Sequence, residues 1–254
     1  MEPWRTAIVE TDAEHIRIRG YDIAALMRNT GFADVLFLLH RGRLPNAGES
    51  ALLNAILVSA ADHGPGAPSC ATARLAASGN RESLSAAVAA GVLAIGNEHG
   101  GAGAQAMEMI AAGVARAARE QLSLAEAARR EVEAARKAGR RLPGLGHRVH
   151  SRDPRTPVLF DMARGHGVAA AGVEYMSALQ AAAEELIRPL PINIDGALAA
   201  ILHDLGFAPA AGKLVFIVAR VAGLSAEVAE EHAREKPMRI RIPVCYDGPE
   251  AREL

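Results

Sequence analysis

Alanine-rich apolar segments, separated by short breaks that contain glycine or proline, run through most of the sequence. Alanine has the highest helix propensity of all residues, and its small side chain lets helices approach closely. Glycine and proline interrupt helices, and residues 62–68 contain two of each. The pattern therefore predicts a chain made almost entirely of short helices. So little predicted strand excludes a Rossmann sheet and a (β/α)₈ barrel.

Apolar periodicity and capping residues give the expected helices. The segment 83–95 is apolar nearly all round, so we expect it in the middle of a helical bundle. A short alternating stretch at 15–20 predicts one strand, and 238–246 is expected to be extended. The expected helices are 21–28, 32–40, one capped by Asn46, 70–77, 83–95, 102–119, one beginning at Ser123, 156–163, 168–187, one opening at 193–196, 213–222 and 225–234.

The balance of charge limits the possible partners. Lys and Arg number 28 against 29 Asp and Glu, which gives a net charge of −1. Nucleic-acid binding and attachment to anionic lipid need an excess of positive charge, so neither is expected. No stretch of 18 apolar residues predicts a membrane span. Cys70 and Cys245 are far apart in the sequence and fit ordinary thiols of a cytoplasmic protein.

Several common catalytic motifs are missing from the sequence. It contains no His-Glu-x-x-His, no Cys-x-x-Cys, no Gly-x-Ser-x-Gly and no Walker loop. His147 and His150 are three residues apart, but they lie in a glycine-rich stretch rather than a helical one. We therefore expect no metal site.

Three histidines and one aspartate stand where the helices break. His63, His99 and His147 each have glycines close by, and Asp195 stands at a predicted helix start. Any one of them alone could be a surface histidine or a helix-capping aspartate. Together, a carboxylate and several imidazoles suit proton abstraction next to a carbonyl group. The carboxylate takes the carbon-bound proton, and an imidazole donates a hydrogen bond to the enolate oxygen.

These motifs, in this order, resemble the citrate synthase superfamily. The similar segments are 142–155 (LPGLGHRVHSRDPR), 98–102 (EHGGA), 192–195 (INID), 19–22 (RGYD), 44–45 (LP) and 62–63 (DH). The resemblance implies an all-α, citrate synthase-like fold with large and small helical domains. The large domain would comprise residues 1–112 and 193–254, and the small domain residues 113–192. It also implies a homodimer, for which the apolar helices between residues 83 and 119 would suit the interface.

Two details are similar to the citryl-CoA lyase branch, which includes the lyase module of ATP-citrate lyase. Asp195 is followed by Gly196 and Ala197, and His63 is followed by Gly64-Pro65. This resemblance implies a lyase that cleaves citryl-CoA to acetyl-CoA and oxaloacetate. The presence of His99 keeps a small citrate synthase open as an alternative. A non-catalytic CoA-binding helical protein is the alternative of another class.

The resemblance implies a role for each matched residue. Asp195, His99 and His147 would be catalytic: Asp195 exchanges the proton at the acetyl carbon, His99 binds the enolate oxygen, and His147 handles the proton of the tertiary hydroxyl. The oxaloacetate-derived part would be bound by His63, Arg155 and Arg220. The CoA thioester arm would pack against Gly144, Leu145 and Gly146. Coenzyme A enters as the thioester substrate, and no tightly bound cofactor is implied.

One position departs from the family pattern. Synthases supply an arginine from the partner subunit in an Arg-Pro segment, and Lys236 stands there in this sequence. Because lysine lacks the planar guanidinium fork, Arg239 or Arg241 could take the role, or the substrate could carry one carboxylate fewer, as citramalyl-CoA does. The basic residues between 129 and 141 fit a solvated helix face; alternatively, Arg140 or Arg141 meets a CoA phosphate.

Overall fold

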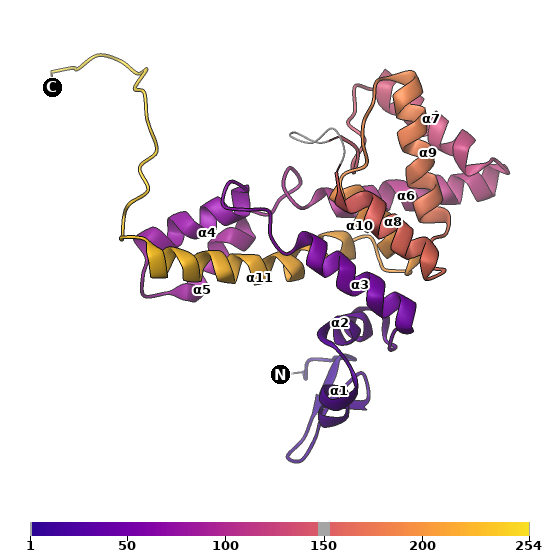
Figure 1. Cartoon of the computed structure of the whole chain (residues 1–254), viewed down its shortest axis with the longest axis horizontal. Coiled ribbons are helices and arrows are strands. Elements are labelled where there is room, and N and C mark those ends of the chain that lie inside the picture. The colour runs from indigo at the N-terminus through magenta and orange to yellow at the C-terminus, as the bar shows by residue number, and fades with distance from the viewer. Residues whose placement is uncertain (1, 147–152, 254) are drawn as a thin grey trace.

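The computed structural model describes residues 2–146 and 153–253, and it is mostly helical (Figure 1). The helices are α1 (Ile23–Asn29), α2 (Phe32–Arg41), α3 (Ala47–Ala60), α4 (Pro68–Gly79), α5 (Leu84–Leu93), α6 (Ala102–Glu120), α7 (Leu124–Lys137), α8 (Arg155–Gly165), α9 (Ala171–Leu186), α10 (Ile194–Asp204) and α11 (Ala211–Arg234). The expected all-α class is confirmed.

Side-chain caps start three of these helices where the sequence predicts them. Asn46 and Ser123 each form a capping box, with Glu49 and Glu126 respectively, and Asn193 accepts a hydrogen bond from the backbone N–H of Gly196. Each cap satisfies an N–H group that the first helical turn leaves without a partner. Since Asn193 begins α10, it also fixes Asp195 in the first turn of that helix.

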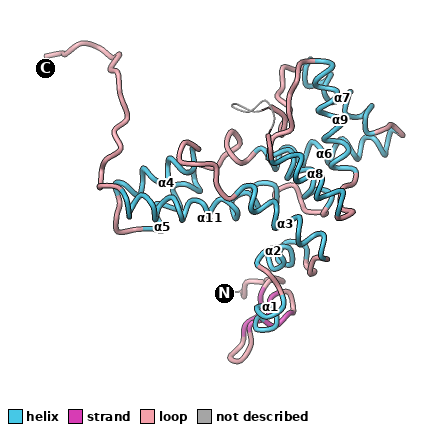
Figure 2. Tube along the Cα trace, viewed as in Figure 1, coloured by secondary structure: helices cyan, strands magenta, loops and turns pink. Residues whose placement is uncertain are grey.

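A small antiparallel sheet lies beside α1 near the N-terminus (Figure 2). Its strands are β1 (Val9–Thr11), β2 (Ile16–Ile18) and β3 (Tyr21–Asp22), in that order. The strand expected at 15–20 is β2. The other two were missed: β3 falls within the helix expected at 21–28, and β1 lies before the first expected element.

The two helices expected at 213–222 and 225–234 are wrong, because α11 is one continuous helix. Gly223 does not end it. A Cβ atom at this position would lie 2.3 Å from Oδ2 of Asp62, so the glycine serves close approach to the α3–α4 loop rather than a break.

The expectation of a fully buried helix at 83–95 is also wrong. In α5 only Ala87 and Gly91 are buried, whereas Leu84 is 58% exposed and Leu93 is 85% exposed. The buried face packs against α4 and α11. An apolar helix can therefore lie at the surface of the single chain, with its other face available to a partner.

The buried apolar side chains of the described residues form two hydrophobic cores, and α11 belongs to both. The larger core includes α3, α6 and α8–α10, and it receives Val215 and Phe216 from α11. The smaller core lies between α4, α5 and the second half of α11, which supplies Leu224 and Val228. Arg220 is therefore placed where α11 passes from one core to the other.

After α11 the chain runs as an extended segment that leaves the body of the molecule, drawn yellow in Figure 1. Ile242, Val244 and Tyr246 in this segment are exposed. Among the described residues, none of the helices has both the length and the apolar character needed to cross a membrane.

Candidate active site

Two predicted carboxylate-binding arginines meet at the end of α3. Arg155 donates from Nη1 to the carbonyl oxygen of Ser59 at 3.0 Å, and Arg220 donates from Nε to that of Ala60 at 3.1 Å. Because these carbonyls belong to consecutive residues, the two guanidinium groups are neighbours. Asp153 orients Arg155 further through bonds of 2.9 and 2.8 Å to Nε and Nη2. The guanidinium groups of Arg155, from α8, and Arg220, from α11, are thus held close together, and the Nε–Nη2 edge of Arg155 is paired with Asp153.

Asp195, in the first turn of α10, lies near enough to Arg155, Arg220 and Asp153 for their charges to act on its carboxyl group. Burial raises the pKa of its carboxyl to about 6, although the nearby charges of Arg155 and Arg220 act to lower it. Its Oδ1 atom is buried and has no hydrogen-bond partner within the described part of the chain. A carboxyl with a pKa near neutrality can both accept and return a proton, as a general acid–base group must.

His99, between α5 and α6, is fixed by Ser69. The backbone N–H of Ser69 donates to Nε2 of His99 at 3.2 Å, and Oγ of Ser69 lies 2.9 Å from the same nitrogen. A backbone N–H can only donate, so Nε2 must be the acceptor nitrogen. The neutral ring therefore carries its proton on Nδ1, in the tautomer that can donate a hydrogen bond to an oxyanion.

Ser69 also connects His99 to the arginine pair. Nη1 of Arg220 donates to Oγ of Ser69 at 3.2 Å, so Ser69 is shared by the histidine and the arginine. Ser69 is fully buried in the first turn of α4. The sequence analysis did not single it out. A serine in the first turn of a helix is common, and no local pattern marks this one as a partner of residues 30 and 151 positions away.

The described part of the glycine-rich loop, residues 142–146, is joined to the segment that carries Asp195. The backbone N–H of Asn193 donates to the carbonyl oxygen of Gly144 at 3.0 Å, and its side-chain Nδ2 donates to the carbonyl oxygen of Gly146 at 2.8 Å. The backbone N–H of Gly146 in turn donates to the carbonyl oxygen of Pro191 at 2.7 Å. A Cβ on Gly196 would lie only 2.4 Å from the Gly144 carbonyl oxygen. The glycine after Asp195 is therefore required for this backbone contact.

The other residues predicted for the site have separate surroundings. His63 is exposed in the loop between α3 and α4, and Leu145 forms an isolated β-bridge with Ile192. His147 lies outside the described residues. Lys236 is exposed just beyond α11. Arg239 contacts the fully buried carboxylate of Glu231 through Nε and Nη2 and also pairs with Glu235, so its charge is used within its own chain.

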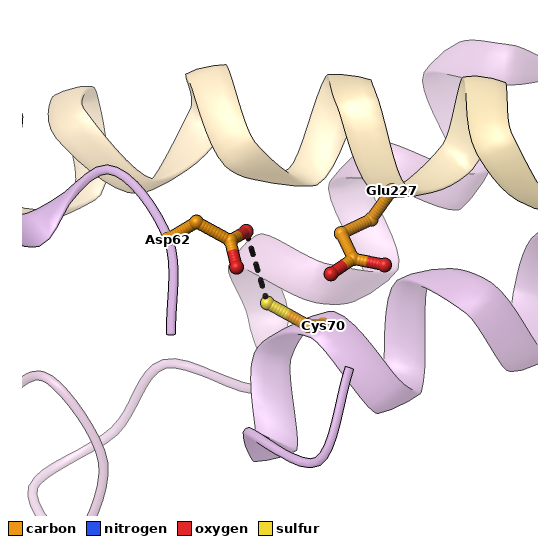
Figure 3. Close-up of side chains that lie close together, drawn as sticks. All are labelled: Asp62, Cys70 and Glu227. Atoms are coloured by element: carbon orange, nitrogen blue, oxygen red, sulfur yellow. Dashed lines mark hydrogen bonds between the residues drawn. The ribbon is translucent and has the colours of Figure 1, made fainter. Parts of the chain in front are cut away.

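Asp62, Cys70 and Glu227 form a cluster beside His63 (Figure 3). Their ligand atoms all lie within 4.8 Å of one another. The Cys70 thiol lies 3.6 Å from Asp62 Oδ2, and Arg74 donates to Glu227 at 2.5 Å. Burial and the charge of Asp62 raise the pKa of the Cys70 thiol, which keeps it protonated. These contacts explain the cluster structurally: its polar side chains pack together where the α3–α4 loop, α4 and α11 meet.

Four of the six basic residues between 129 and 141 are paired with carboxylates. Arg129 pairs with Glu185, Arg130 with Glu120 and Arg140 with Glu131. Arg141, which precedes the glycine loop, pairs with Glu98, the residue before His99. Such exposed pairs are weak, and they fit the expected solvated helix face.

Comparison with known proteins places this geometry in a family. A family model described as "Citrate synthase, C-terminal domain" matches residues 46–241. A solved structure of citryl-CoA lyase from Hydrogenobacter thermophilus is 37% identical, with a TM-score of 0.91, and the match covers 100% of this chain and 98% of that one.

Two curated relatives are longer than this chain. ATP-citrate synthase subunit 1 of Sordaria macrospora is 27% identical over 79% of this chain, and the citrate synthase of Haloferax volcanii is 29% identical over 82% of it. The matched regions span only 29% and 53% of those two relatives. The family model, by contrast, covers well over half of this chain, and the chain therefore belongs to the citrate synthase family.

Proposed function

We propose that the protein is a citryl-CoA lyase, which cleaves citryl-CoA, or a related 3-hydroxy-3-carboxyacyl-CoA, to acetyl-CoA and oxaloacetate. One observation carries the proposal: Asp195, whose Oδ1 is buried, lies near two arginines, one of which is joined through Ser69 to His99. This arrangement provides a proton-transfer group, an oxyanion donor and carboxylate binders in one place. The 37% identity to a structure named citryl-CoA lyase supports this choice within the family.

The proposed cleavage is a retro-aldol reaction. A base removes the proton of the tertiary hydroxyl, the carbon–carbon bond breaks, and its electron pair forms the enolate of acetyl-CoA. His99 would donate from Nδ1 to the enolate oxygen, and protonated Asp195 would deliver the proton to the enolate carbon. His147 is proposed as the base at the hydroxyl, from the family resemblance alone. The raised pKa of Asp195 supports its role, because a useful fraction is protonated near neutral pH.

Arg155 and Arg220 would bind the carboxylates of the oxaloacetate-derived part, with His63 as a third contact. Arg220 uses Nε and Nη1 for contacts with Ala60 and Ser69, so Nη2 is the atom we assign to the substrate carboxylate. A guanidinium held from behind in this way loses little freedom when it binds. Arg220 is only 2% exposed, so its contact with a carboxylate would be well shielded from water.

The CoA arm is proposed to lie along Gly144, Leu145 and Gly146, where no side chain protrudes from the two glycines. The loop is already joined to Pro191 and Asn193, so a thioester packed against it would lie close to Asp195. We propose no tightly bound cofactor and no metal.

We further propose a homodimer in which the exposed leucines of α4 and α5, such as Leu75, Leu84 and Leu93, meet a second copy. In that dimer Lys236 or Arg241 would approach the partner's substrate, since Arg239 is held by Glu231. The large domain would combine residues 1–112 and 193–254 around the small domain. Residue 112 lies within α6, which would then be shared by both domains. The two free cysteines favour a reducing, cytoplasmic location.

The direct test is an assay of purified protein with citryl-CoA, followed separately by acetyl-CoA with oxaloacetate. A lyase releases acetyl-CoA and oxaloacetate from citryl-CoA. A small citrate synthase, which the presence of His99 favours as the second candidate, would release citrate and free CoA. Citrate formation without net cleavage would contradict the lyase proposal. A non-catalytic CoA-binding protein would bind the thioester and change neither mixture.

A further inference from the structure

The aromatic ring of Phe216 lies between His99 and Arg220. Phe216 belongs to α11, four residues before Arg220, and is 4% exposed. Its ring centroid is 6.5 Å from that of His99, with an angle of 83° between the ring planes. The guanidinium carbon of Arg220 lies 4.9 Å from the same centroid. One apolar side chain thus contacts both polar groups that the proposed reaction uses.

Gly100, the residue after His99, makes room for this ring. A Cβ atom there would lie 2.2 Å from Cε1 of Phe216, and the residue has φ of +73°, which favours glycine. The turn that carries His99 therefore lies directly against the ring. The contact sets how far the turn can approach α11.

We propose that Phe216 is a positioning residue that, together with Ser69, couples His99 to Arg220 as one unit. Ser69 joins the two side chains through hydrogen bonds, and Phe216 joins them through a T-shaped ring contact and a cation–π contact. Two different connections fix both the separation and the orientation of the two groups.

This inference rests on the proposed function. There, the thioester oxygen at His99 and the carboxylate at Arg220 belong to the same substrate molecule, so the separation of the two groups must match it. A displacement of about 1 Å can cost a reaction about a hundredfold in rate. The ring would therefore act on the reaction without touching the reacting atoms.

Phe216→Leu keeps an apolar side chain and removes the ring. We expect kcat for citryl-CoA cleavage to fall by about ten- to a hundredfold and KM to rise, since both His99 and Arg220 are affected. Phe216→Tyr retains the ring and should keep most of the activity. The matched control is Phe37→Leu, the same change at a fully buried ring that packs against Phe207 instead. The control should lower stability and leave kcat unchanged.

A second readout does not depend on turnover. Long-range ¹H–¹⁵N spectra of the histidine rings report the tautomer of His99 in the ligand-free protein. Wild type and Phe37→Leu should show the proton of His99 on Nδ1, and Phe216→Leu should show a mixture or a shifted signal. If Phe216→Leu matches Phe37→Leu in both kcat and ring signals, the proposal is wrong. If wild type cleaves no citryl-CoA, the proposed function fails, while the spectra still decide whether the ring positions His99.

Discussion

The backbone N–H of Ser69 points at Nε2 of His99 over 3.2 Å, and this contact determines which nitrogen of the imidazole carries the proton. Nδ1 is left as the donor. Because the contact comes from the main chain, it survives any substitution of the Ser69 side chain except proline. The side-chain hydroxyl adds a separate link to Arg220 at 3.2 Å. The backbone and side chain of Ser69 can therefore be tested separately.

Ser69→Ala removes the Oγ contacts with both Arg220 and Nε2 of His99, and it retains the backbone N–H bond to His99. We expect kcat to fall by about tenfold, which corresponds to about 1.4 kcal/mol, because Arg220 loses one of its fixed partners. The histidine tautomer should not change. Steady-state kinetics and ring ¹⁵N spectra measure the two effects. Ser225→Ala, at an exposed serine that bonds only its own helix at Ala222, is the control and should change neither.

Gly196→Ala should separate the glycine loop from α10. The new Cβ would lie 2.4 Å from the Gly144 carbonyl oxygen and 2.6 Å from Cε of Met176, so one of the two backbones must move. We expect the free energy of unfolding to fall by about 2 kcal/mol, and KM for the CoA thioester to rise. Denaturant titration measures the first and kinetics the second. Gly66→Ala, where no atom lies within 4 Å of the added Cβ, should leave both unchanged.

The pH dependence of stability should carry the signature of Asp195. Its pKa is about 6 in the folded chain against an ordinary value of 3.8, so the folded state binds the proton more tightly than the unfolded state. The contribution of Asp195 to stability is therefore fully present below about pH 4 and is lost as the pH rises through about 6. The difference between the two pKa values corresponds to about 3 kcal/mol. Asp195→Asn should remove this loss, so the variant is more stable than wild type at pH 7.

Asp204, at the other end of α10, has a pKa shifted in the opposite direction. Its carboxylate accepts hydrogen bonds from the backbone N–H groups of Ala170, Gly172 and Val173 at the start of α9. These bonds and His203 hold its pKa below the ordinary value despite burial. Asp204→Asn should therefore lower stability at pH 7, and the difference should shrink in acid. If Asp195→Asn and Asp204→Asn both raised, or both lowered, the stability of the protein at pH 7, the opposite pKa shifts assigned to the two carboxyl groups would be wrong.

Substitution of Lys236 and of Arg239 should affect different properties, KM in the first case and stability in the second. Arg239→Ala removes one of the two cations that hold buried Glu231, the other being Arg74, and we expect about 1 kcal/mol of lost stability. Lys236→Ala removes an exposed charge and should leave stability unchanged, while KM for citryl-CoA rises if it approaches the partner's substrate. A rise of KM only in the Arg239 variant would reverse this assignment.

Local signals predicted the parts of the molecule that depend on neighbouring residues. Asn46, Ser123 and Asn193 start helices because each caps its own first turn, so the position of Asp195 in the first turn of α10 follows from residues 193–196. Glycine follows both His99 and Asp195, and a side chain at either position would collide with a neighbouring group. The structure shows that the approaching groups are Phe216 at Gly100 and Gly144 at Gly196.

Long-range relationships were not predictable in this way. Ser69 and Phe216 matter because α4 and α11 meet at His99, and their own neighbours in the sequence give no sign of it. Gly223 indicated a helix end but instead accommodates the loop that carries Asp62. The apolar character of α5 predicted burial, yet within the described part of the chain Leu84 and Leu93 on its outer face remain exposed.

Exchange of the methyl protons of acetyl-CoA with solvent deuterium, followed by mass spectrometry, tests the central claim most directly. The account predicts that wild type exchanges these protons and that Asp195→Asn does not, because a carboxamide cannot accept the proton. Binding of acetyl-CoA by the variant, measured by calorimetry, should be largely retained. Exchange at the wild-type rate in Asp195→Asn would contradict the assignment of Asp195 as the group that moves the proton at carbon.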